Sequence, residues 1–293
     1  MQTCQTSVTP ILRVLRNVVA GTLLASSFLF LSQSHVYGQE MSMINHQPMQ
    51  HSNNTFFGKA GKLGSEEMTT FVTLSPDVDP VTGAHAPVAA GVEFSAALLQ
   101  NPPDEKTMLA IDFPIQAART PYQYMMINWN PHGHEPAGIY DKAHFDFHFY
   151  IQDFQDVMAI KPGTCEGIDC ADYQEAVKDV PAQYLPANYM NRRAVAPFMG
   201  NHLRDMAAPE WTGHPFTRTL LLGSDHGRIT FLEPMITLAA LMAEPNLCSD
   251  IKQPASFAKS DYYPRSYCTQ YDETTKKYRV YLSNWIYRSA TQQ

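Results

Sequence analysis

The chain has 293 residues and a formal net charge of −7, and 44% of its residues are hydrophobic and 11% aromatic. This composition excludes an intrinsically disordered protein. The excess of acidic residues argues against nucleic acid or an anionic lipid surface as a partner. A chain of this length can bury a sizeable core, in one large β domain or two small ones.

The first 38 residues have the order of a secretory signal peptide. Arg13 and Arg16 precede an apolar run from Val18 to Leu31, and small residues at positions 36 and 38 offer a cleavage site before Gln39. The run is shorter than the ~20 apolar residues of a membrane span, so we expect cleavage rather than anchoring. Cleavage removes two of the 21 basic residues and none of the 28 acidic ones, which leaves a charge of −9. We therefore expect a secreted or periplasmic protein without membrane insertion after cleavage.

Four cysteines follow the predicted cleavage site: Cys165, Cys170, Cys248 and Cys268. An even number of cysteines in an exported chain favours two disulfides. Of the three pairings, 165 with 170 and 248 with 268 costs the least loop closure. A zinc site at the first pair is the weaker alternative, because an oxidising compartment consumes thiols.

Residues 39–66 are polar, rich in Met, His, Gln and Asn, and without a sustained period, which predicts a flexible leader. The methionines and the histidines His46 and His51 are ligands that suit copper. A plain tether explains the composition better. The rest of the chain, residues 67–293, is predicted to be a single β-rich domain.

From Thr69 onward, short apolar runs such as TTFVTL, TMLAIDF and YQYMMINW alternate with Pro, Asp, Gly and Asn. This spacing predicts a mainly antiparallel β fold, a sandwich or a barrel, with a few short helices; an α+β fold is the alternative. We expect the helices at 171–180 and 237–243. Two hairpins are predicted, with turns at 224–227 and 272–276.

The most informative segment is HFDFHFYI, residues 144–151, because its residue types alternate without a slip. On a strand, Phe145 and every second residue after it face the core, while His144, Asp146 and His148 share the other face. Two imidazoles and a carboxylate are ligands for Zn, Fe, Mn or Cu. Neighbours on one face are about 6.6 Å apart, so one ion is expected to take Asp146 with either histidine, but not both histidines. A polar face with cross-strand hydrogen bonds and no metal is the alternative.

Further ligands must come from elsewhere in the chain. His132 and His134 lie in a loop rich in Pro and Gly before the strand, and can fold back over its polar face. His202 follows a Gly and His214 precedes a Pro, as at the rim of a sheet. Glu233 shares a strand face with two apolar residues, which predicts a partly buried carboxylate that needs a cation or a donor.

These residues predict a divalent metal site. The expected ligands are His134, His144, Asp146, His148 and His202, with Glu233 as a catalytic proton carrier. If the protein is an enzyme, hydrolysis or oxidation at an open metal position is the expected activity, because a bound metal lowers the pKa of its water. The alternative is a non-catalytic, stress-related assembly or binding protein. Arg204 and Asp205 are expected to be surface charges, and His226 a solvated turn residue.

Four sequence blocks, in their order, resemble those of a family of uncharacterised exported bacterial proteins. They are GHEP, YDKAHFDFHFY, PFMGNH and PEWTGHPFTRTLLLGSDHGRITFLEPMITL, within residues 65–245. The family is typified by a thermophile protein controlled by an extracytoplasmic-stress sigma factor. It has no agreed activity, so the resemblance implies export and a ring-like homo-oligomer but no reaction. This chain departs from the family pattern at Leu203, where an aromatic is common, and at the Asp-His-Gly turn.

Overall fold

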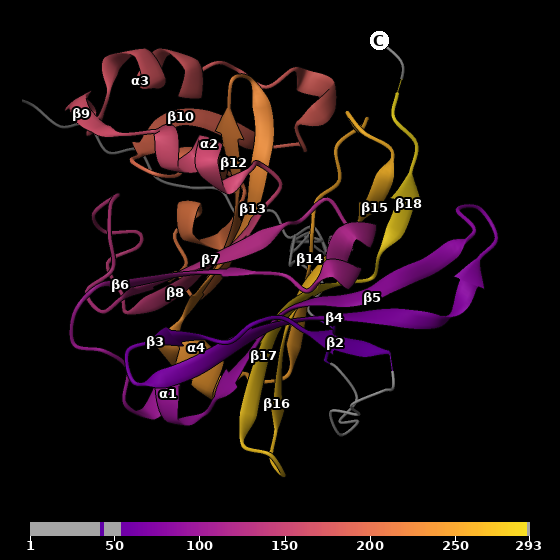
Figure 1. The fold of residues 1–293 in the computed structure, drawn as a ribbon. Helices are drawn as coiled ribbons and strands as arrows, with labels where there is room; N and C mark the ends of the chain where they lie inside the picture. Colours follow the sequence, from indigo (N-terminus) through magenta and orange to yellow (C-terminus); the bar gives the residue numbers. More distant parts are fainter. Residues whose placement is uncertain (1–41, 44–53, 292–293) are drawn as a thin grey trace, which may run out of the picture. The chain divides into compact units, whose positions relative to one another are not determined.

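The first of two large sheets contains the amino-terminal and carboxy-terminal strands, all paired antiparallel (Figure 1). The computed structural model describes residues 42–43 and 54–291. The predicted signal peptide and residues 39–41 and 44–53 of the predicted leader lie outside these residues. In spatial order the strands are β1 (Ser42–Met43), β14 (Leu247–Asp250), β16 (Ser266–Asp272), β17 (Lys277–Ser283), β5 (Ala84–Ser95), β4 (Glu66–Asp79) and β2 (Thr55–Phe57), and β3 (Gly61–Leu63) also pairs with β4.

The second large sheet is formed by the middle of the chain, and its strands are also antiparallel. In spatial order they are β10 (Tyr189–Ala196), β11 (Gly200–Asp205), β12 (Arg218–Asp225), β13 (Arg228–Thr237), β8 (His144–Tyr150), β7 (Tyr124–Asn130) and β6 (Thr107–Asp112). A separate pair joins β15 (Asp261–Tyr263) to β18 (Ile286–Arg288), and β9 (Pro162–Cys165) is a short strand outside these sheets. The strand with the alternating His and Phe residues, β8, lies inside the second sheet.

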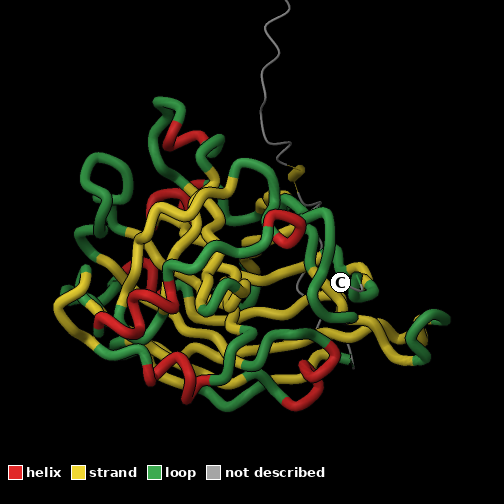
Figure 2. The backbone as a smooth tube through the Cα atoms, turned by 90° about the horizontal axis from the view of Figure 1, so that it is seen from above, coloured by secondary structure: helices red, strands yellow, loops and turns green. Residues whose placement is uncertain are grey.

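The helices are short, and most of the backbone is strand or loop (Figure 2). They are α1 (Ala97–Gln100), α2 (Phe154–Ala159), α3 (Cys170–Ala176) and α4 (Leu238–Ala243), with 3-10 turns at Ile115–Arg119, Ala182–Tyr184 and Pro209–Trp211. The two predicted helices correspond to α3 and α4, and α3 ends four residues earlier than expected. Among the described residues, no helix is long and apolar enough to cross a membrane.

The main core lies between the two large sheets. Phe145, Phe147 and Phe149 of β8 are fully buried, and the Phe147 ring stacks on Phe94 of β5 with 6.5 Å between centroids. Val92 of β5 and the three phenylalanines of β8 belong to the same apolar cluster. The predicted mainly antiparallel β fold is therefore confirmed, and it is sandwich-like rather than a closed barrel.

The strands begin earlier than the sequence analysis predicted. Residues 55–57 form β2 and residues 61–63 form β3, and both pair with β4. The predicted flexible leader is thus wrong for residues 54–66. Phe56 packs against the core and Leu63 is fully buried, so two apolar residues in a polar stretch are enough to bring it to the sheet.

Both predicted hairpins and both predicted disulfides are confirmed. The β12–β13 turn has positive φ at His226 (50°) and Gly227 (70°), and the side chain of His226 is 61% exposed, as expected. The second turn joins β16 to β17. Cys165 is bonded to Cys170, and Cys248 to Cys268, which lies opposite it on the neighbouring strand.

Candidate metal centres

The polar face of β8 is as deeply buried as its core face. His144, Asp146 and His148 are 0%, 4% and 1% exposed. Aromatic rings pack against this face: the centroid of the Phe216 ring is 5.3 Å from that of His144, and Phe216 forms a small apolar cluster with Tyr140. Polar groups without water must find partners within the protein or bind an ion.

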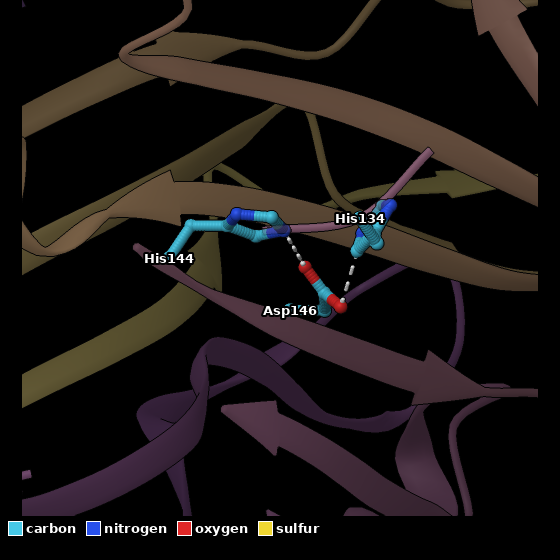
Figure 3. A group of neighbouring side chains, drawn as sticks. All are labelled: His134, His144 and Asp146. Atoms are coloured by element: carbon cyan, nitrogen blue, oxygen red, sulfur yellow. Dashed lines mark ion pairs between the residues drawn. The ribbon is translucent and has the colours of Figure 1, made fainter. Parts of the chain in front are cut away.

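One candidate metal group, group I, consists of His134, His144 and Asp146. The Nε2 atom of His144 is 3.0 Å from Asp146 Oδ1, and that of His134 is 3.6 Å from Asp146 Oδ2. The two imidazoles face the carboxylate from different sides (Figure 3). Of the two predicted alternatives for Asp146, the structure therefore groups it with His144.

The loop before β8 brings His134 back over the strand. Its ring centroid is 4.7 Å from that of His144, and its backbone N–H donates to the carbonyl of Tyr140 at 3.0 Å. This return requires Gly133, which has a φ of +72° and on which a Cβ would lie 2.1 Å from the Tyr140 oxygen. The side chain of His134 remains 31% exposed, so group I is reachable from solvent.

The second candidate metal group, group II, consists of His148, His202 and Glu233. The distance from His148 Nε2 to Glu233 Oε1 is 3.3 Å, and from His202 Nε2 to Glu233 Oε2 it is 3.7 Å. The side chains of His148 and Glu233 are 1% and 2% exposed, against 13% for His202. Group II is therefore more enclosed than group I.

Gly223 allows His202 to reach group II from two strands away. In the register of the sheet, Gly223 of β12 lies between His202 of β11 and Phe231 of β13. A Cβ on Gly223 would lie 2.1 Å from the Phe231 ring. Because this position has no side chain, the Phe231 ring covers β12, and its centroid is 5.2 Å from that of His202.

All four histidines are held in the same way by the backbone. The Nδ1 atoms of His134, His144, His148 and His202 lie 2.8, 2.6, 3.0 and 3.1 Å from carbonyl oxygens. A carbonyl only accepts, so each Nδ1 carries a hydrogen and the neutral ring has its lone pair on Nε2. Metal-binding histidines have this arrangement, in which a hydrogen bond from the other nitrogen fixes the ring.

The Nε2 atoms face carboxylate oxygens without bonding to them. In group I, His144 Nε2 and Asp146 Oδ1 are buried and have no hydrogen-bond partner, although they are 3.0 Å apart. In group II, His148 Nε2 and Glu233 Oε2 are also buried without a hydrogen-bond partner, and Oε2 lies 3.7 Å from His202 Nε2. Acceptors that converge in this way repel one another unless a cation lies between them. Both groups are therefore suited to a metal ion.

The two groups differ in charge when no metal is bound. Burial lowers the pKa of His148 to about 4 and that of His202 to about 3, so both rings are neutral ligands at neutral pH. Burial and the charge of Asp146 raise the pKa of Glu233 well above its usual range, although the charge of Arg204 opposes them. Without a metal ion the neutral form of Glu233 is therefore favoured, because the charge of Arg204 does not compensate for burial.

Group I already holds charge. Burial raises the pKa of Asp146, but His134 and His144, which donate to its carboxylate from Nε2 when they are protonated, outweigh burial and hold this pKa below its usual range. Asp146 in turn raises the pKa of His134 despite the burial of that ring. A proton on His134 thus takes part of the role of a metal ion.

Two asparagines that the sequence analysis missed support group I. Asn130 on β7 donates from Nδ2 to Asp146 Oδ2 at 2.7 Å. The Oδ1 atoms of Asn128 and Asn130 are buried without a partner, and these residues lie opposite Asp146 and His144 in the register. Two polar residues at a spacing of two in the apolar run YMMINWN were the signal that could have identified them.

The remaining predicted residues lie elsewhere. His132 and His214 are exposed and belong to neither group. Glu233, predicted to carry protons, lies among the potential ligands. The prediction of Arg204 and Asp205 as surface charges is wrong: Asp205 is 5% exposed and pairs with Lys252, and the Nε of Arg204 is buried. Alternation along β11 places Arg204 on the covered face that His202 occupies.

No family model, curated protein or solved structure matches this chain. The function of this protein is therefore inferred from the geometry of groups I and II.

Proposed function

We propose that this protein is an exported metal-binding protein that holds divalent transition-metal ions in groups I and II. The observation that carries the proposal is the common orientation of the four histidines. Each Nδ1 is bonded to a backbone carbonyl and each Nε2 faces a carboxylate oxygen, at 3.0 to 3.7 Å. Two imidazoles and one carboxylate suit Zn, Fe, Mn or Cu.

Group I is the better candidate for a catalytic centre. Three protein ligands leave an open position on a zinc or iron ion, as in many metalloenzymes. The exposed edge of His134 provides access from solvent. A bound metal supplies Lewis acidity and acidifies a coordinated water, which supports hydrolysis or, with a redox-active ion, oxidation. The protein residues hold the ligands in place and exclude bulk water.

A non-catalytic role is the second candidate, and the enclosure of group II favours it. An ion held by His148 and Glu233, both almost fully buried, would stabilise the sheet without taking part in a reaction. Relaxation of water protons by the Mn²⁺-loaded protein separates the two roles. Strong enhancement indicates an open coordination position and favours an enzyme; its absence favours a structural ion.

Cobalt binding tests the proposal itself. The protein is stripped with a chelator and titrated with Co²⁺ while visible absorption is recorded. We expect bands that saturate at a fixed number of ions per chain, and their loss in the double variant His144→Ala/His148→Ala. His132→Ala is the matched control, because this exposed histidine belongs to neither group. Absorption that persists in the folded double variant contradicts the proposal.

A further inference from the structure

Arg204 places an unneutralised positive charge beside group II. It follows His202 by two residues on β11, so both side chains lie on one face of the strand. Among the described residues no carboxylate forms an ion pair with it. Its Nε is buried without a hydrogen-bond partner, which is costly for a charged donor unless a partner binds.

The Trp211 ring packs against this arginine. The guanidinium carbon lies 5.6 Å from the centroid of the Trp211 ring, so the indole supports the guanidinium. Burial lowers the pKa of Arg204, and the charge of Glu233 opposes this effect.

A second arginine is nearby and carries the same charge. The β10–β11 register shifts between Asn191 and Ala194, and Arg192 lies in this irregularity. Arg192 is exposed, and its charge disfavours the charged form of Arg204. Strand irregularities of this kind often redirect side chains beside active sites. Two arginines that repel each other, in a chain of net charge −7, indicate a site for an anion.

We propose that group II, with its metal ion bound, and Arg204 together bind an oxyanion of a ligand, either a phosphoryl or a carboxylate group. This inference rests on the proposed function, because it needs a cation in group II. A metal ion engages the charge of Glu233, which leaves Arg204 free to pair with another anion. The planar guanidinium matches two oxygens of such a group. His202, the most exposed ligand of group II, lies on the strand face of Arg204 and marks the side of approach.

The test is calorimetric titration of the zinc-loaded, full-length mature protein with inorganic phosphate and, separately, with acetate. We expect binding of at least one of them, weakened tenfold or more in Arg204→Gln and partly restored in Arg204→Lys. Arg119→Gln is the control, because this arginine is exposed and lies at the end of a 3-10 turn. Zinc content and circular dichroism are measured for every variant. A higher affinity for phosphate than for acetate identifies the ligand group as phosphoryl. A higher affinity for acetate identifies it as a carboxylate.

Two results overturn the inference, and they can be distinguished. If zinc is retained but neither anion binds, or if Arg204→Gln binds like Arg119→Gln, the anion site is wrong and the metal sites stand. If no zinc binds to the wild-type protein and phosphate and acetate do not bind either, the proposed function fails together with the inference.

Discussion

Glu233 of β13 lies opposite His148 of β8, and its Oε1 is 3.3 Å from the Nε2 of that histidine. The flanking pairs Leu232↔Phe149 and Met235↔Asp146 fix this register. The same strand β8 contributes His144 and Asp146 to group I, so one alternating segment serves both groups. This arrangement predicts that the two groups can be removed separately.

Removing one ligand should remove one ion. We expect His148→Ala to lower the metal content from two ions per chain to one, and His144→Ala to do the same through group I. Each loss also removes the stabilisation by that ion, about 2.7 kcal/mol when the free metal is at 100 times its dissociation constant. Mass spectrometry of bound metal and thermal unfolding check both effects. Loss of both ions from either folded single variant would contradict two separable groups.

Two glycines offer a reciprocal test. A methyl group on Gly223 must displace the Phe231 ring and with it His202, so Gly223→Ala should weaken metal binding by group II and cost about 1–3 kcal/mol of stability. Gly133→Ala should instead weaken group I, because a Cβ there meets the Tyr140 carbonyl. Stepwise metal titration of both variants distinguishes the groups. If both substitutions affect the same ion, the roles given to these glycines are wrong.

The ion pairs of Glu93 predict a pH dependence far from the metal groups. Burial raises the pKa of Glu93, but Lys277 and Arg279 outweigh it and hold the pKa below its usual range. The lowered folded-state pKa means that these pairs stabilise the protein above the unfolded pKa, about 4.3. Their contribution is lost as the pH falls through the folded value.

We therefore expect Glu93→Gln to lower the free energy of unfolding at pH 7 by about 1–3 kcal/mol, because Arg279 loses its charged partner. The difference from the wild type should shrink between pH 5 and pH 3. Urea unfolding at several pH values measures it. Asp77→Asn, at an exposed position, is the control. A difference that does not change with pH would show that the ion pairs are not its source.

The two disulfides should contribute unequally. Cys248–Cys268 closes a loop with a sequence separation of 20, whereas the separation in Cys165–Cys170 is 5. In the chain-entropy model, replacing both cysteines with Ala costs about 3 kcal/mol for the longer loop and about 2 kcal/mol for the shorter. Urea unfolding of the two double variants gives the comparison. A larger loss for the shorter loop would contradict this entropic ranking.

The sequence predicted local features well and distant partners incompletely. Alternation along β8 was sufficient to separate its core face from its polar face, because a strand has a period of two. The short disulfide loops and the hairpin turns are equally local. Assigning Asp146 to His144 rather than His148 required the position of the His134 loop, which is set by a close backbone contact at Gly133.

The sequence alone could not predict which residues form group II, because that requires the order of the strands in the sheet. His202 reaches Glu233 only because β11, β12, β13 and β8 are neighbours and because Gly223 has no side chain. The same alternation that applies to β8 would have placed Arg204 beside His202, but a charged residue was interpreted as a surface residue. Residues 54–66 were interpreted from composition, and the core contacts of Phe56 and Leu63 outweigh that signal.

The most direct measurement is metal content by inductively coupled plasma mass spectrometry, on the protein from residue 39 onward, purified without a histidine tag. The comparison is the variant His46→Ala/His51→Ala, which removes the leader histidines that lie outside the described residues. Groups I and II predict two ions per chain in both proteins. Absence of metal from both proteins after reloading would contradict metal binding by groups I and II. Metal that disappears with the leader histidines would contradict it as well.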